Sequence, residues 1–195
     1  MPYGTITPEM EVLLRQAVAG KYVWDLGAGD GGHARMLLRL GAKHVTLIDK
    51  DWHVHHRKPW RCTGTTVDAR PYYEVSDTMV APPDVAWLSW PTNTVLHGLI
   101  PILERTPTVI YLGSNTGGTA CGSKKLFTHF AGRELTGHIG HMQNSLLLLG
   151  APLPDGVTRR LTYEEVAGGD PAHCYPSTMG ALDYAATAEL LTTRM

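Results

Sequence analysis

One segment settles the fold class: Val23-Trp24-Asp25-Leu26-Gly27-Ala28-Gly29-Asp30-Gly31-Gly32. An apolar run at residues 22–26 leads directly into closely spaced glycines, and a helical pattern follows at residues 33–40. Glycine tolerates a positive φ angle and lets the backbone approach a ligand closely. The segment therefore predicts a strand, a tight turn and a helix, with a ligand site at the turn.

Strand and helix patterns alternate on both sides of this segment. A first helix is expected to open at Thr7-Pro8-Glu9 and to end at Gly20, and Pro101 is expected to kink or divide a later one. Further helices are predicted at residues 33–40, 94–105, 124–135 and 181–191, and strands at 22–26, 45–48, 65–67, 85–90, 108–112, 144–149 and 157–163.

This alternation predicts an α/β fold, a Rossmann-like doubly wound and mostly parallel seven-stranded sheet with helices on both faces. The last two predicted strands have no helix between them, so we expect them to form a C-terminal antiparallel hairpin. The length of 195 residues suits one domain covering residues 1–195.

Composition limits the classes of partner and site. The formal net charge is -1, so no long-range positive field attracts nucleic acid, and a polyanionic partner must meet a local patch. Cys62, Cys121 and Cys174 are odd in number and far apart, and they predict neither a disulfide framework nor a metal site. With no signal-peptide pattern and no membrane-spanning apolar run, we expect a cytoplasmic protein.

The glycines alone fit two cofactor classes. Gly32 also fills the third position of the dinucleotide pattern G-x-G-x-x-G, so a nicotinamide oxidoreductase is one alternative. The carboxylates of Asp25 and Asp30 would repel a pyrophosphate and suit a cationic cofactor that has no phosphate. A non-catalytic module that keeps the cofactor site, and a turn that needs glycine for packing alone, remain further alternatives.

The run from Asp25 to Gly31 matches (D/E)-x-G-x-G-x-G, the first motif of the class I S-adenosylmethionine-dependent methyltransferases, and the sequence resembles that superfamily. Residues 7–51 resemble the small archaeal protein-lysine methyltransferases, and the later chain is similar in architecture only. The resemblance implies a methyltransferase whose cofactor is S-adenosylmethionine, and we expect N-methylation of an acceptor that is a protein amine, a base or a small molecule. It places the methionine end of the cofactor against Asp25, Gly27, Ala28, Gly29, Asp30 and Gly31.

Two acidic residues follow the next two predicted strands. Asp49 ends the second strand, 22 residues after Gly27, where an acid accepts hydrogen bonds from the ribose hydroxyls in this fold class. Lys50 beside it belongs to the same predicted cofactor-binding set. By resemblance, Asp68 would hold the adenine amino group and Ala69 would offer its backbone N–H to the ring, although a plain turn aspartate fits Asp68 equally well.

The end of the fourth predicted strand is where the resemblance places the transferred methyl group. Ser89-Trp90-Pro91-Thr92 partly matches the (D/N/S)-P-P-(Y/F/W) pattern of base methyltransferases, and it lacks the first proline and the final aromatic residue. We expect Ser89, Trp90, Pro91 and Asn93 to face the acceptor, with Ser89 also touching the cofactor. Alternatively these residues only pack or end the strand, as is expected of Trp87 in the core.

Three weaker features surround this site. The histidine-rich loop at residues 51–61 is interpreted as a solvated basic loop, with substrate or nucleic-acid contact as its alternative. His138-Ile139-Gly140-His141 is a poor metal pattern. The Gly/Ser/Thr-rich segment at residues 113–123 is interpreted as a lid or a substrate-binding loop.

Overall fold

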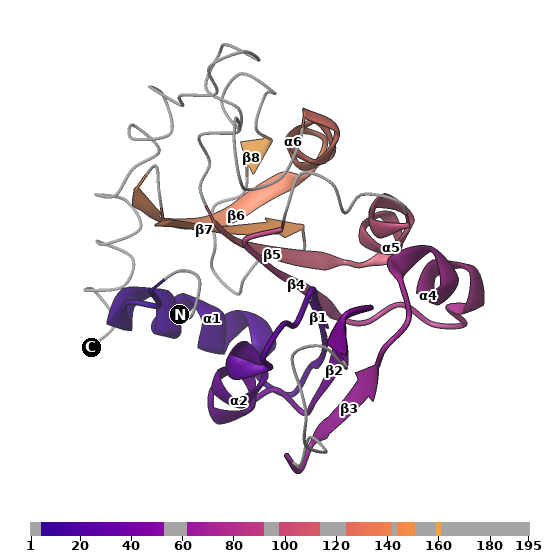
Figure 1. Cartoon of the computed structure of the whole chain (residues 1–195). Helices are drawn as coiled ribbons and strands as arrows, with labels where there is room; N and C mark the ends of the chain where they lie inside the picture. Colours follow the sequence, from indigo (N-terminus) through magenta and orange to yellow (C-terminus); the bar gives the residue numbers. More distant parts are fainter. Residues whose placement is uncertain are drawn as a thin grey trace.

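The computed structural model describes residues 5–52, 62–91, 98–113, 124–141, 144–150 and 159–160. A central sheet lies between two layers of helices (Figure 1). Helices α1 (Pro8–Val18) and α2 (Gly32–Arg39) lie on one face, and α4 (Tyr72–Thr78), α5 (Leu99–Arg105) and α6 (Lys124–Ala131) lie on the other. The predicted Rossmann-like α/β architecture is confirmed.

Within the described residues, eight strands make up the sheet in the order β3-β2-β1-β4-β5-β7-β6-β8. The parallel strands are β1 (Tyr22–Leu26), β2 (His44–Ile48), β3 (Thr65–Asp68), β4 (Val85–Ser89) and β5 (Thr108–Gly113). The antiparallel strands are β7 (Asn144–Gly150), β6 (Glu134–His141) and the two-residue β8 (Arg159–Arg160). Strand order reverses between β1 and β4, which is where open α/β sheets bind ligands.

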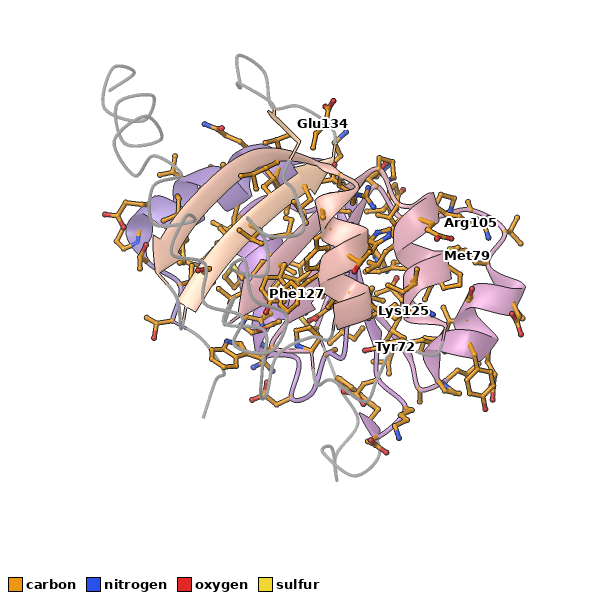
Figure 2. All side chains as sticks on the ribbon, turned by 90° about the horizontal axis from the view of Figure 1, so that it is seen from above. Tyr72, Met79, Arg105, Lys125, Phe127 and Glu134 are labelled. Carbon is orange, nitrogen blue, oxygen red and sulfur yellow. The ribbon has the colours of Figure 1, made fainter. Side chains whose placement is uncertain are left out.

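Alternate residues of each strand pack into two separate cores. On β4, Val85 and Trp87 join the core under α1 and α2, whereas Ala86 and Leu88 join the core under α4, α5 and α6. Trp87 is fully buried, as predicted. Figure 2, seen from above, shows α4, α5 and α6 side by side, with Tyr72 and Arg105 at opposite ends of this helix layer.

Local sequence signals place the helix ends. The Thr7 side chain accepts the backbone N–H of Met10 at 3.3 Å, and Pro8 begins α1, as expected of a capped helix. Pro101 neither kinks nor divides the described part of its helix, because α5 begins at Leu99 and Pro101 lies in the first turn. Backbone N–H groups of a first turn have no partner within the helix, so proline is tolerated there.

The C-terminal antiparallel hairpin pairs β6 with β7, and not residues 144–149 with residues 157–163 as predicted. We expected a helix at residues 124–135, but α6 ends at Ala131 and residues 134–141 form β6, which pairs with β7. The register shifts between Leu135 and Gly137, and this bulge breaks the alternation by which a strand is recognised. Within residues 157–163 only Arg159–Arg160 is described as strand, and it pairs with β6.

Helix α4 was not predicted at all. It has seven residues, and Tyr72 and Val75 are its buried side chains, which is too short a pattern for a helical period to be recognised. The predicted helix at 181–191, the histidine-rich residues 53–56 and residues 114–123 lie outside the described residues. No helix in the described ranges is both long and apolar enough to cross a membrane.

Candidate functional site

The turn after β1 has the backbone that its glycines predict. Gly27, Gly29 and Gly31 all have positive φ angles, at 80°, 52° and 72°. The N–H of Gly27 donates to the carbonyl of Ile48 at 2.8 Å, which ties the turn to the end of β2. A Cβ atom added at Gly29 would meet nothing within 4 Å, so the space beside this residue is open. The turn therefore presents bare backbone to an open region at the switch point.

Asp49 connects the end of β2 to this turn. Its Oδ2 atom accepts the N–H of Gly29 at 2.8 Å, and its Oδ1 atom accepts the N–H of Asp51 at 2.8 Å. An ionised carboxylate has about four lone-pair positions. Two backbone donors orient the side chain and leave further positions for the hydroxyls of a ligand.

Asp25 lies beneath the turn, in β1. It is 1% exposed, and no partner for its Oδ2 atom exists among the described residues. Burial first, and then the nearby charges of Asp49 and Asp30, raise the pKa of Asp25 to about 8. The protein without a ligand thus keeps Asp25 protonated at neutral pH, and a nearby cation would favour the ionised form.

Asp30 is exposed and shapes the start of α2. Its Oδ1 atom accepts the N–H of Gly32 at 2.9 Å. His33 follows in the first turn of α2, and its ring centroid lies 5.2 Å from that of Trp87. Burial lowers the pKa of His33, against an opposing effect of Asp30, so its imidazole is neutral at pH 7. No sequence pattern predicts a role for His33.

The residues predicted to contact the adenine and the ribose have other contacts within the protein. Asp68 accepts two hydrogen bonds from the Arg70 guanidinium, at 2.8 and 2.6 Å, and this pairing lowers the pKa of Asp68. Ala69 packs against the core under α1 and α2. Lys50 is exposed, and its Nζ atom lies 3.8 Å from Asp51. Asp68 and Asp49 are adjacent in the sheet, because the N–H of Asp49 donates to the carbonyl of Asp68 at 3.2 Å.

The end of β4 carries the predicted acceptor residues. The Oγ atom of Ser89 is buried and has no partner among the residues the structure describes. Trp90 has a φ angle of 50°, the one positive value outside glycine in the described ranges, and its N–H donates to the Leu112 carbonyl at 2.8 Å. A positive φ angle strains the backbone of a bulky residue, and backbone strain of this kind is concentrated at functional sites. Pro91 is partly buried, and Asn93 lies outside the described residues.

Tyr72, the first residue of α4, reaches the same turn from the other face of the sheet. Its hydroxyl lies 3.0 Å from the position that a Cβ atom on Gly27 would occupy. The sequence offers one signal for this residue: an aromatic side chain shortly after the acid that ends β3. No group of three metal-ligating side chains is found in the described parts of the chain.

The sheet order, the parallel-to-antiparallel change after β5 and the glycine turn after β1 together define the fold of the class I methyltransferases. The sequence itself matches no family model and no curated protein.

Solved structures share this fold. The candidate methyltransferase yhhF of Escherichia coli is 12% identical, with a TM-score of 0.54, over 79% of this chain and 92% of that one. An O-methyltransferase family protein of Burkholderia thailandensis is 12% identical, with a TM-score of 0.52, over 75% of this chain and 56% of that one. A candidate rRNA methylase of Clostridium thermocellum is 13% identical, with a TM-score of 0.51, over 76% of this chain and 98% of that one. At these identities the likeness establishes the fold.

Proposed function

We propose that this chain is an S-adenosylmethionine-dependent methyltransferase that acts on a nitrogen or oxygen nucleophile. One observation carries the proposal: two carboxyl groups, Asp25 and Asp49, flank an open glycine turn at the switch point of the sheet. The buried Oδ2 atom of Asp25 has no partner among the described residues, and a cationic ligand would satisfy it.

The residues suit the parts of this cofactor. Asp25 and the turn at residues 27–31 would hold its cationic methionine end, and Asp49 with Lys50 its ribose. Asp68 and Ala69 would hold the adenine, provided that Arg70 shares the Asp68 carboxylate. The cofactor, when bound, supplies a methyl group on a sulfonium, which is electrophilic without any help from an acid.

The end of β4 would position the acceptor. Ser89 has a buried hydroxyl that can accept from or donate to a nucleophile, and Trp90 offers an aromatic face to a cationic amine or a base. Pro91 and Asn93 complete this predicted set. Methyl transfer is an in-line displacement, so alignment and exclusion of water contribute most of the rate. We assign these residues the orienting role.

A dinucleotide fits the turn less well. A pyrophosphate needs free N–H groups at the start of the helix, but Asp30 already takes the N–H of Gly32. The negative charge of Asp30 would also repel a phosphate at this place. These two facts favour a cofactor without phosphate.

Two features of the chain favour different classes of methyl acceptor. The resemblance of residues 7–51 to archaeal protein-lysine methyltransferases favours a protein amine, whereas the partial Ser89-Trp90-Pro91-Thr92 pattern favours a base. We propose that the reaction takes place in the cytoplasm and that residues 1–195 form one methyltransferase domain.

Two measurements test the proposal. Isothermal titration calorimetry should detect micromolar binding of S-adenosylmethionine and of its demethylated product, and no tight binding of NADH. Labelled-methyl transfer into fractionated cell extract should then identify the acceptor pool. Tight NADH binding without S-adenosylmethionine binding would reverse the assignment, and cofactor binding without transfer to protein, nucleic acid or small molecules would mark a non-catalytic module.

A further inference from the structure

Tyr72 is a buried aromatic residue whose polar end lies at the cofactor turn. Its ring packs in the core that contains Leu26 and Ile48, the last residues of β1 and β2. Its hydroxyl lies 3.0 Å from where a Cβ atom on Gly27 would be. The phenol therefore extends along the carboxyl ends of β1 and β2 and ends against the backbone of Gly27.

Asp49 lies at the same place. Gly27 and Ala28 both donate their N–H groups to the carbonyl of Ile48, at 2.8 and 3.3 Å, and Asp49 is the next residue. The Tyr72 hydroxyl and the Asp49 carboxylate thus approach the turn from different elements, α4 and the end of β2. Both groups lie at the carboxyl ends of the parallel strands, where a ligand of this fold binds.

The backbone of α4 is held firmly in this position. A Cβ atom on Gly98 would lie 2.2 Å from the N atom of Tyr73, so the start of α5 packs directly on the backbone of α4. The side chain of Tyr72 then has little freedom, because its ring fills the core between these elements. Figure 2 shows Tyr72, which begins α4, at the end of the helix layer opposite to Arg105, which ends α5.

The charges around Tyr72 keep its hydroxyl neutral. Burial raises the pKa of Tyr72, and the carboxylates of Asp49 and then Asp25 raise it further. The group is consequently an O–H donor at every working pH, and it lies near the Asp49 carboxylate, which acts as an acceptor. A donor next to an acceptor is the pairing that a ribose hydroxyl recognises, since each hydroxyl both donates and accepts.

We propose that Tyr72 is a cofactor-binding residue whose hydroxyl donates a hydrogen bond to a ribose hydroxyl of the nucleoside that Asp49 holds. This inference rests on the proposed function, which supplies the nucleoside cofactor. Gly27 is part of the same arrangement. A side chain at this position would displace the Tyr72 phenol and block the approach of its hydroxyl to the ribose.

The test compares Tyr72→Phe with Tyr73→Phe by titration calorimetry. The first change removes only the hydroxyl at the turn, and the second removes the hydroxyl of the adjacent, exposed tyrosine, which faces Glu74. Tyr72→Phe should weaken binding of S-adenosylhomocysteine and of adenosine about 3- to 10-fold, the effect of one neutral hydrogen bond. Tyr73→Phe should bind as wild type, and thermal unfolding should show that both variants fold.

Nucleoside analogues locate the bond. The loss caused by Tyr72→Phe should vanish with either 2′-deoxyadenosine or 3′-deoxyadenosine, whichever lacks the bonded hydroxyl. An equal loss with both analogues would mean that Tyr72 only shapes the site, and unchanged adenosine affinity would also overturn the inference. Wild-type protein that binds adenosine but not S-adenosylhomocysteine would refute the proposed cofactor. The role of Tyr72 would then be decided by the adenosine affinities of wild type and Tyr72→Phe.

A double-mutant cycle gives an independent measurement. The methyl group of Gly27→Ala would lie 3.0 Å from the hydroxyl, so it should displace that group and weaken adenosine binding. Adding Tyr72→Phe to Gly27→Ala should then cause little further loss. Fully additive losses would contradict a shared role, and wild-type protein that binds no nucleoside would overturn both this inference and the proposed function.

Discussion

The Oδ2 atom of Asp49 accepts the backbone N–H of Gly29 at 2.8 Å, although the two residues lie 20 positions apart in the chain. This bond joins the end of β2 to the glycine turn after β1. It orients the carboxylate before any ligand arrives, because the other oxygen is also held, by the N–H of Asp51. Such preorganisation lowers the entropy cost of binding.

Removal of this carboxylate should abolish most cofactor affinity. Asp49→Ala is expected to weaken binding of S-adenosylhomocysteine by about 10- to 100-fold, since hydrogen bonds to a charged group are the stronger class. Titration calorimetry measures the loss. Asp51→Ala is the matched control, because Asp51 is exposed and contacts Asp49 through its backbone N–H, which the substitution keeps. Equal affinities of wild type and Asp49→Ala would refute the ribose assignment.

Asp25 should make the stability of the ligand-free protein depend on pH. Its pKa is raised from 3.8 to about 8, so the folded state binds more protons than the unfolded state between these values. The free energy of unfolding should therefore fall as pH rises through this window, by at most about 1.4 kcal/mol per pH unit.

Chemical denaturation from pH 5 to pH 8.5 of wild type and Asp25→Asn measures this effect as a difference between the two proteins. The difference is needed because the lowered pKa of His33 gives a slope of opposite sign. Asp77→Asn, an exposed change on α4, should keep the wild-type slope. Parallel curves for wild type and Asp25→Asn would show that Asp25 is ionised in the folded protein.

Gly98→Ala should be strongly destabilising, and Gly20→Ala should not. Both glycines have a positive φ angle, at 82° and 71°, so both variants lose about 1 kcal/mol to backbone strain. At Gly98 the new methyl group also meets the backbone of Tyr73 at 2.2 Å, whereas at Gly20 it meets nothing within 4 Å. Urea denaturation should show an additional loss of about 1–3 kcal/mol for Gly98→Ala. Similar losses in the two variants would contradict the close packing of α5 on α4.

Ser89→Ala should separate stability from binding. The buried Oγ atom has no partner in the described part of the chain, so its removal should leave the free energy of unfolding within about 0.5 kcal/mol of wild type or raise it. Thr106→Val is the comparison, because the Thr106 hydroxyl donates to the Ile102 carbonyl at 2.8 Å and its removal should cost about 1 kcal/mol.

In the same Ser89→Ala protein, binding of S-adenosylhomocysteine or methyl transfer should weaken about 2- to 10-fold. Denaturation and calorimetry on one preparation measure both properties. A variant that is clearly less stable yet binds and reacts normally would assign Ser89 to the core instead of the site.

Local signals in the sequence were sufficient for the first half of the sheet. The run at residues 22–26 became β1 without change of bounds, and Thr7 caps α1, because glycines, caps and short apolar runs act within a few residues of the chain. The strand β6 could not be recognised, because its bulge places Leu135 and Ile139 in opposite cores although they lie four residues apart, and its glycines leave gaps in the apolar pattern. Pairing with β7 and β8 makes that segment a strand.

The sequence by itself determined that a glycine turn follows the first strand, with Asp25, Asp30 and Asp49 near it, and hence the class of fold. The tertiary structure alone decided which of these carboxyls is buried, that Asp49 accepts the N–H of Gly29, and that Tyr72 reaches Gly27 from α4. The physical reason is the distance along the chain over which each effect acts. Backbone conformation depends on neighbouring residues, whereas desolvation, charge and hydrogen bonding at a site depend on strands brought together from distant parts of the chain.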